Sequence, residues 1–270
     1  MTPSIQLAED LLRAVGPGRF LILGDEDRLS AELRTKGCRI EQIATLLITQ
    51  TLQRLGKSYD TVVIGGAALG TIDDPESLLR SLRRVARRFL ALAPGAWVAA
   101  LRNQGERGLA GYWANALIGA GFRRSPAHFA LPHYAQLNSP ELMPIEVYER
   151  IDDDLLRQWP LERLLRERDL HMDMSREFGP RADAHLVRYA LAADLVRPGD
   201  TVLDCACGLG YGSALLAARS AGGRFIGVDI DADAIAYARA NFGRTHGVEY
   251  RVASGTRLEF LPDASVDFIA

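Results

Sequence analysis

Short apolar runs alternate with stretches of helical spacing through the first half of the chain. The helical spacing predicts helices over 4–14, 28–35, 75–92 and 109–119. The short runs predict strands at 20–23, 39–43, 61–64 and 97–101, with a weaker pair between 127 and 137. Strands that alternate with helices predict a parallel, doubly wound sheet, because a helix usually returns the chain before the next parallel strand begins.

The second half holds a strand, a glycine-rich turn, a helix start and a further strand in direct succession. The first strand ends in Asp204 and the second ends in Asp229. A glycine turn lets a ligand approach the backbone, and a helix N-terminus presents free N–H groups to it. Together with acids at adjacent strand ends, this pattern predicts a nucleoside-type cofactor site at the carboxyl edge of a parallel sheet. The first strand is expected to begin at 202, the helix to cover 214–219, and the second strand to cover 224–229.

Asp204 distinguishes between two kinds of cofactor. In a dinucleotide site the helix N-terminus receives a doubly charged pyrophosphate, which an aspartate just before the glycines would repel. S-adenosyl-L-methionine (SAM) has an α-amino group to place near Asp204, ribose hydroxyls to place on Asp229, and no phosphate. An NAD(P)-dependent oxidoreductase is the alternative, supported by the glycines and by Asp229 but disfavoured by Asp204.

The segment from Val202 to Ser213 resembles the class I SAM-dependent methyltransferases. The wider segment from Arg188 resembles a bacterial subset found with cell-surface polysaccharide biosynthesis. The resemblance implies SAM as cofactor, with the turn around its methionine part, Asp229 on the ribose and Ile230 beside the adenine. Ser254 stands where the family often has an acid that binds the adenine amino group, so the sequence departs from the family there. The turn residues implied to bind the cofactor are Asp204, Ala206, Gly208, Gly210 and Gly212.

The first half repeats features of the second in the same order. Residues 7–23 and residues 191–203 each contain a helix, a Pro-Gly turn and an apolar strand in that order. A second match, in the same order along the chain, pairs 58–64 with 265–270. The fold class expected is α/β, with two Rossmann-like, doubly wound, parallel-sheet domains in tandem. We expect a degenerate methyltransferase-like domain over 1–140, a helical connector over 141–177 and a SAM-dependent methyltransferase domain over 178–270.

The first domain is expected to lack a cofactor site. Its turn reads Gly24-Asp25-Glu26-Asp27, and three acids would crowd the helix N-terminus by bulk and by charge. A divalent cation bound by these acids is the alternative, disfavoured because consecutive residues seldom converge on one ion. The second domain is expected to be truncated after its fourth strand, which would leave an apolar edge at Ala270. We therefore expect the sequence to be a fragment, with a correspondingly incomplete catalytic half.

Composition excludes several classes of protein. With 32 basic and 34 acidic residues, the chain has no global attraction to nucleic acid or to an anionic membrane. The most apolar run, 89–101, is broken by Pro94-Gly95, so no membrane span is expected and the protein is predicted to be cytoplasmic. The three cysteines form neither a disulfide framework nor a metal motif; Cys205 and Cys207 are expected to fill space beside the turn.

The acceptor side of the reaction carries no motif. A sugar hydroxyl or another small polar acceptor, including a glycan, is expected from the resemblance. His171 and His185 precede the site, but neither is assigned as a catalytic base. Arginines recurring over 80–88 are expected on a solvated helix face, with docking of an anionic partner as the alternative. A non-catalytic scaffold with this fold is a third hypothesis for the function. The sequence allows a homo-oligomer without predicting one.

Overall fold

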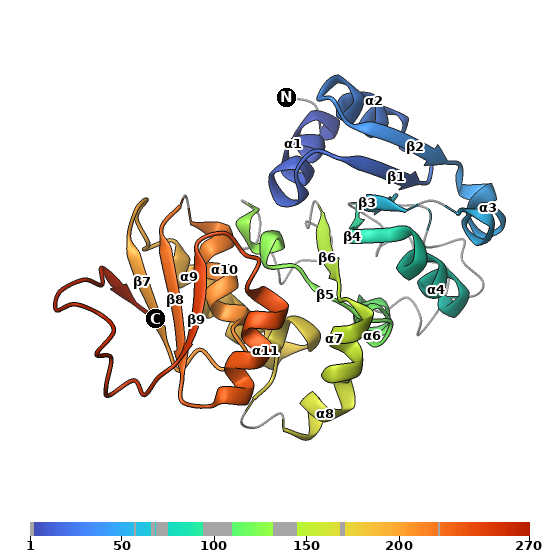
Figure 1. Cartoon of the computed structure of the whole chain (residues 1–270). Coiled ribbons are helices and arrows are strands. Elements are labelled where there is room, and N and C mark those ends of the chain that lie inside the picture. The colour runs from blue at the N-terminus through green and yellow to red at the C-terminus, as the bar shows by residue number, and fades with distance from the viewer. Residues whose placement is uncertain are drawn as a thin grey trace. The chain divides into compact units, whose positions relative to one another are not determined.

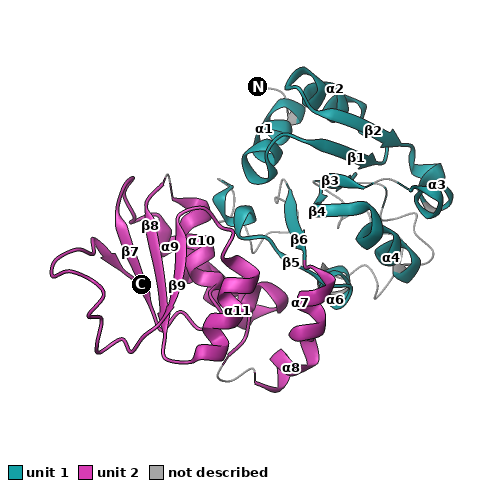
Figure 2. Ribbon diagram, viewed as in Figure 1, with its two compact units in different colours: residues 1–150 teal, residues 151–270 magenta. Residues whose placement is uncertain are grey.

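The computed structural model describes residues 3–56, 58–65, 68, 75–93, 110–131, 145–167, 171–220 and 222–270. The chain divides into two compact units, unit 1 over Met1–Arg150 and unit 2 over Ile151–Ala270 (Figure 2). Residues 146–150 of the expected connector therefore lie in unit 1 and its later part lies in unit 2. Within the described ranges, no helix is long and apolar enough to cross a membrane.

Unit 1 is built on a six-stranded sheet of order β2-β1-β3-β4-β6-β5 (Figure 1). The pairs among β1 to β4 are parallel, whereas β6 is antiparallel to both β4 and β5. Its strands are β1 (Arg19–Leu23), β2 (Arg39–Ile43), β3 (Tyr59–Ile64), β4 (Ala86–Leu92), β5 (Phe122–Arg124) and β6 (Glu146–Arg150). Its helices are α1 (Pro3–Val15), α2 (Asp27–Thr35), α3 (Ile48–Arg54), α4 (Pro75–Val85) and α6 (Ala110–Gly119), with 3-10 turns η1 (Thr45–Leu47) and η4 (Pro126–Ala130).

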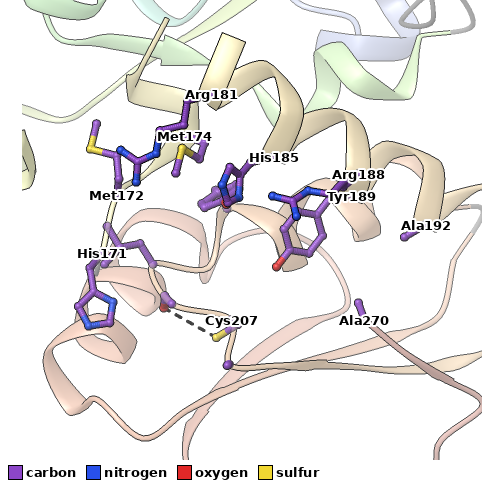
Figure 3. Close-up of a pocket in the computed structure, with 14 residues that line it drawn as sticks. His171, Met172, Met174, Arg181, His185, Arg188, Tyr189, Ala192, Cys207 and Ala270 are labelled. Atoms are coloured by element: carbon purple, nitrogen blue, oxygen red, sulfur yellow. Dashed lines mark hydrogen bonds between the residues drawn. The ribbon is translucent and has the colours of Figure 1, made fainter. Parts of the chain in front are cut away.

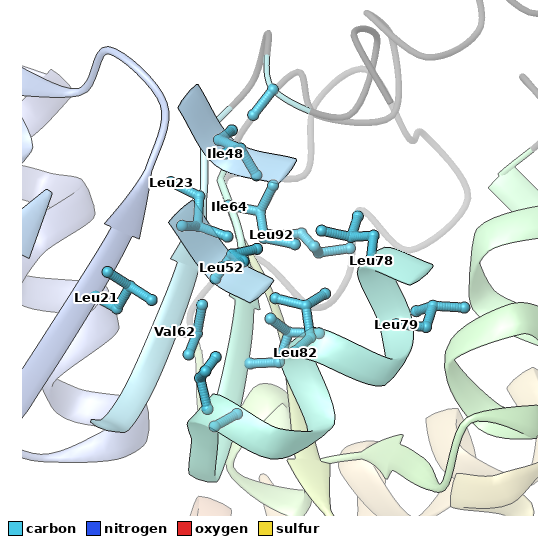
Figure 4. Close-up of a cluster of buried hydrophobic side chains, with 14 of the residues drawn as sticks. Leu21, Leu23, Ile48, Leu52, Val62, Ile64, Leu78, Leu79, Leu82 and Leu92 are labelled. Carbon is cyan, nitrogen blue, oxygen red and sulfur yellow. The ribbon is translucent and has the colours of Figure 1, made fainter. Parts of the chain in front are cut away.

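Alternate residues of the central strands enter two separate cores, as a sheet covered on both faces requires. Leu21 and Leu23 pack with side chains of α3, α4 and α6 in one core (Figure 4). Phe20 and Ile22 point the other way and pack with side chains of α1 and α2. The double winding predicted for this half is thus present in unit 1.

Several predicted elements of unit 1 are wrong in detail. The helix expected over 75–92 ends at Val85, and 86–92 form β4, whose last four residues are buried between two neighbouring strands. Within the strand pair expected between 127 and 137, residues 127–130 belong to the 3-10 turn η4 and Leu131 follows it in a bend. Residues 132–137 and the strand expected at 97–101 lie outside the described residues. The short α3, β5 and β6 were not predicted. The antiparallel edge pair also corrects the expectation of a wholly parallel sheet.

The arginines of 80–88 do not share one helix face. Arg80, Arg83 and Arg84 lie on α4, while Arg87 and Arg88 lie on β4. Arg83 donates to the carbonyl oxygen of Gly121, and Arg84 donates to those of Leu52 and Gln53. Arg87 and Arg88 approach Asp60 and Glu149 at 3.9 and 4.0 Å. The single helix face expected for these arginines is therefore wrong, because 86–92 form a strand, and the intramolecular partners give no support to a docking surface.

Unit 2 contains a four-stranded, wholly parallel sheet of order β10-β7-β8-β9. The strand that starts the glycine motif, β7, therefore lies between β8 and β10, just as β1 of unit 1 lies between β2 and β3. The strands are β7 (Thr201–Cys205), β8 (Arg224–Asp229), β9 (Val248–Val252) and β10 (Phe268–Ile269). The helices are α7 (Asp153–Gln158), α8 (Leu161–Arg166), α9 (Pro180–Ala193), α10 (Tyr211–Arg219) and α11 (Ala232–Phe242), with the 3-10 turn η6 (Met174–Arg176).

Both faces of this sheet are apolar. Val202 and Phe225 pack with α9 and α10 on one face. Leu203, Ile226 and Val228 lie on the other, against side chains of the segment 258–266. The arrangement places the carboxyl ends of β7 and β8 side by side, because Asp204 pairs in register with Gly227. The acids and the glycine turn predicted from the sequence consequently meet at one sheet edge.

Candidate functional site

The turn after β7 has a left-handed backbone at three positions. Ala206 has φ 63°, Gly208 has φ 53° and Gly210, the N-cap of α10, has φ 81°. Left-handed backbone is costly for a residue with a Cβ, so Ala206 is under local strain. No atom lies within 4 Å of a Cβ built on Gly208, which is therefore the glycine that opens toward a ligand.

The other two glycines of the turn are required by packing within the protein. A Cβ on Gly210 would lie 2.6 Å from the Cβ of Ala238 on α11. A Cβ on Gly212 would lie 2.1 Å from the ring of Tyr189 on α9. The absence of side chains lets α9 and α11 pack closely against α10. These two glycines therefore support the turn through helix packing and not through contact with a ligand.

Asp204 is buried beneath the turn, with 2% of its surface exposed. Its carboxylate accepts hydrogen bonds from the hydroxyl of Tyr189 at 3.1 Å and from that of Ser213 at 2.6 Å. Burial raises the pKa of Asp204 to about 6, although both hydroxyl donors act to lower it. The carboxylate is thus held by hydroxyl groups from two helices, and its charge lies behind the pocket wall.

Asp229 ties the two strand ends together. Its carboxylate accepts from the backbone N–H of Gly208 and from that of Asp231, each at 2.9 Å. An ionised carboxylate can accept about four hydrogen bonds, so these two leave capacity for a ligand hydroxyl. The structure thus gives Asp229 a turn-stabilising role beside the ribose role expected for it.

Ile230 and Ser254 lie beyond this carboxylate. Ile230 is 76% exposed, a high value for a large apolar side chain. The hydroxyl of Ser254 is 2.8 Å from that of Thr256 and also accepts from the N–H of that residue. Ser254 is partly exposed in its own turn, and neither residue lines the pocket described next.

A pocket of about 470 Å³ opens beside the turn, wholly within unit 2 (Figure 3). Of the sequence-predicted residues, Ala206 and Gly208 line it, together with Cys207 and the two candidate histidines. Asp204, Gly210, Gly212 and Asp229 do not line it. The remaining lining residues are Met172, Met174, Arg181, Arg188, Tyr189, Ala192, Leu209, Tyr211 and Ala270.

One wall of the pocket is the segment 171–176, which carries no recognisable motif. Asp173 is fully buried and accepts from both the N–H and the hydroxyl of Ser175. It also accepts from the hydroxyl of Tyr237 on α11 at 2.7 Å. Nε2 of His171 lies 3.0 Å from the carboxylate of Asp231, the N-cap of α11. Two polar contacts therefore anchor this segment, which we call the strap, to α11.

The opposite wall is α9, from which Arg181, His185 and Arg188 line the pocket at spacings of four and three residues (Figure 3). Nδ1 of His185 is 3.5 Å from the hydroxyl of Tyr211. Burial lowers the pKa of His185, and the charges of Arg188 and Arg181 lower it further, whereas Glu177 opposes them. The imidazole is therefore neutral near pH 7 and can accept a proton.

Other groups at the turn are held in their neutral forms. Burial raises the pKa values of Tyr189 and Tyr211, and the negative charge of Asp204 adds to the effect at both. Burial also raises the pKa of the Cys207 thiol. A buried thiol that stays protonated is a poor nucleophile, which agrees with its expected space-filling role.

The corresponding turn of unit 1 is built differently. A Cβ on Gly65, just after β3, would lie 2.8 Å from the side chain of Glu26, so Glu26 already lies against the backbone there. Asp25 accepts from the hydroxyl of Thr45, and Asp27 accepts from the amide of Gln42. The acids have neighbours within the unit, and no group of three or more potential metal ligands occurs among the described residues.

The parallel sheet with a glycine turn and two acids at its carboxyl edge defines unit 2 as a Rossmann-like α/β fold. Residues 202–270 match a family profile described as a methyltransferase domain. This match supports a class I SAM-dependent methyltransferase and is consistent with SAM as the cofactor. The open backbone at Gly208, the spare acceptor capacity of Asp229 and the exposed Ile230 fit such a ligand.

No curated protein sequence matches the chain significantly. Among solved structures, phosphoethanolamine N-methyltransferase 2 of Haemonchus contortus in complex with SAM is 15% identical, over 100% of this chain and 67% of that chain, with a TM-score of 0.33. The 16S rRNA N2 G1207 methyltransferase of T. thermophilus in complex with AdoMet and guanosine is 17% identical, over 97% and 72%, with a TM-score of 0.30. Likenesses at this level carry no conclusion about the acceptor.

Proposed function

We propose that unit 2 binds SAM and transfers its methyl group to a hydroxyl of a small polar acceptor, such as a sugar. The observation that carries the proposal is the pocket beside the turn, where Ala206 and the open backbone of Gly208 adjoin the buried charge of Asp204. From just behind the turn, the negative charge of Asp204 would repel a pyrophosphate bound there and attract the ammonium group of SAM. The bacterial polysaccharide resemblance supports a sugar or glycan acceptor.

The protein's part in the reaction is mainly to position groups. SAM supplies a methyl group already activated on a sulfonium, so in-line orientation accounts for much of the catalysis. In this proposal the ribose hydroxyls bind Asp229, the adenine lies against Ile230 with Ser254 at its edge, and the methionine part lies along Ala206 and Gly208. Arg188, next to Tyr189 on α9, pairs with the α-carboxylate.

His185 is the proposed general base for the acceptor hydroxyl. Its imidazole is neutral because burial and two neighbouring arginines lower its pKa, and it lines the pocket directly. With Nδ1–H donating to the hydroxyl oxygen of Tyr211, Nε2 carries the lone pair that accepts the proton. His171 is the weaker candidate, because its Nε2 already contacts Asp231.

Titration calorimetry with S-adenosylhomocysteine (SAH) and with NAD tests the cofactor. We expect SAH to bind and NAD to give no heat above dilution. Gly208→Asp should abolish SAH binding, because a carboxylate would occupy the open side of the turn, whereas Gly37→Asp, at another open glycine in unit 1, should not. Binding of NAD in preference to SAH would favour an oxidoreductase and contradict the proposal.

We also propose that unit 1 is a degenerate methyltransferase-like domain without a cofactor site. The matching order of the first strands in the two sheets supports this duplication, and so does the position of Glu26 against Gly65. The near balance of charge continues to favour a small acceptor over nucleic acid.

A further inference from the structure

The lining of the pocket is unusual in its charge. Two arginine side chains line it, and no acidic side chain is among its described lining residues. Asp204 lies behind the wall, where Tyr189 and Ser213 hold it. A group that lies beside α9 therefore meets guanidinium groups directly, whereas the negative charge of Asp204 acts at the turn, from behind its backbone.

The two arginines occupy different depths. They are seven residues apart on α9, which corresponds to about 10 Å along a helix axis. Arg188 adjoins Tyr189, whose hydroxyl reaches the end of β7. Arg181 lies in the first turn of α9, the end opposite the connection to β7, and lines the pocket with Met172 and Met174 of the strap. Figure 3 shows His185 between them. A cofactor carboxylate paired with Arg188 thus does not account for the presence of Arg181 in the pocket lining.

The charge of Arg181 suits a second anion. Arg181 forms an ion pair with Glu177 at 3.7 Å, and a guanidinium has five N–H donors, so it can serve an internal acceptor and a ligand at the same time. Both arginines lower the pKa of His185, so both charges are felt at the position of the proposed base. An anion held by Arg181 would keep an adjacent hydroxyl near His185.

We propose that Arg181 binds an oxyanion of the acceptor, a carboxylate or a phosphate monoester, and thereby selects a negatively charged small molecule. The inference rests on the proposed function, because it names the substrate class of the same site. Planar guanidinium groups bind carboxylate and phosphate oxygens in pairs, which adds orientation to attraction. Arg181 is thus a specificity-determining residue for methyl transfer.

Calorimetry on the full chain tests this with three probes: glucuronate, glucose 6-phosphate and glucose, each with and without SAH. We expect at least one of the two anionic sugars to bind at least tenfold more tightly than glucose, and a comparison of the two separates a carboxylate from a phosphate preference. In Arg181→Gln that advantage should be lost, while the dissociation constant for SAH changes less than twofold, which also shows that the variant is folded.

Matched variants separate this role from that of the cofactor. Arg244→Gln removes an exposed arginine outside the pocket and should change no affinity. Arg188→Gln should weaken SAH but not 5′-methylthioadenosine, which lacks the amino acid part. The inference is overturned if neither anionic sugar binds better than glucose, or if Arg181→Gln weakens SAH as much as it weakens the sugars. Failure of SAH to bind the unaltered chain would instead contradict the proposed function, and the arms without SAH would still decide the role of Arg181.

Discussion

Ala206 and Gly208 share a left-handed backbone in the turn, yet only one of them has a side chain. Both line the pocket, so the Cβ of Ala206 belongs to the surface that a ligand meets. The strained conformation is retained because its neighbours fix it: the N–H of Cys207 donates to the carbonyl oxygen of Val228, and that of Gly208 donates to Asp229. A constrained backbone at a candidate ligand site is a common place for local strain.

Replacing Ala206 by glycine should stabilise the chain. Relief of the left-handed strain, about 1–2 kcal/mol, exceeds the entropic cost of glycine, about 0.4–1 kcal/mol, so we expect a gain of roughly 0.5–1 kcal/mol in the free energy of unfolding. Urea denaturation measures it. Ala264, exposed and with φ 54°, provides a control outside the pocket, and Ala264→Gly should show a similar gain. A loss of stability in Ala206→Gly would mean that the methyl group contributes packing.

Asp204 predicts a dependence of stability on pH. Its pKa in the folded chain is about 6, against an ordinary 3.8, so between these values the folded state binds more proton than the unfolded state. The contribution of Asp204 to stability is therefore greatest at low pH and falls as the pH rises through this window, by up to about 3 kcal/mol.

The free energy of unfolding, measured by urea denaturation from pH 4 to pH 7, should accordingly fall less steeply in Asp204→Asn than in the unaltered chain. Asp183→Asn, at a partly exposed acid on α9, serves as a comparison for the replacement of an aspartate outside the turn. An identical slope for Asp204→Asn would show that Asp204 titrates alike in both states.

At the scale of elements, the pocket depends on how α9, the strap and α11 are joined to the glycine turn. The turn and its two acids could be predicted from sequence because they lie within one continuous stretch, 204–229. The strap could not, because Asp173 meets Tyr237 across 64 residues and neither belongs to a motif. The role of Gly212 could not be predicted either, because glycine is required there by contact with the ring of Tyr189 and not by contact with a ligand.

Removing one hydroxyl should loosen the strap. Tyr237→Phe leaves an oxygen of the buried Asp173 without its donor, and we expect a loss of about 1–3 kcal/mol in the free energy of unfolding. Amide hydrogen exchange over 171–176 should accelerate in the same variant. Tyr211→Phe, also on a helix at the pocket, is the comparison, because its hydroxyl contacts His185 rather than the strap. Unchanged exchange in Tyr237→Phe would show that the strap is held by its apolar contacts.

At the scale of the whole molecule, two similar sheets carry different turns. We expect SAH to bind with a stoichiometry of one per chain, because the side chain of Glu26 already lies against Gly65 at the corresponding turn of unit 1. Calorimetry on Glu26→Ala should still give one site. Removing that side chain gives unit 1 neither a glycine-rich turn nor counterparts of Asp204 and Asp229. A stoichiometry of two in the unaltered chain would show that unit 1 binds the cofactor as well.

Local sequence determined the strands β1, β2, β3, β7 and β8, the helices that follow the two turns, and the positions of Asp204 and Asp229 at strand ends, because each of these features arises within one short, continuous stretch of chain. Only the tertiary structure decided that 86–92 form a strand and not the end of a helix, because burial between β3 and β6 overrides helical spacing. It also decided which glycines face the pocket and that α9 aligns Arg181, His185 and Arg188 beside it. Those features depend on contacts between segments far apart in the chain, which no local pattern encodes.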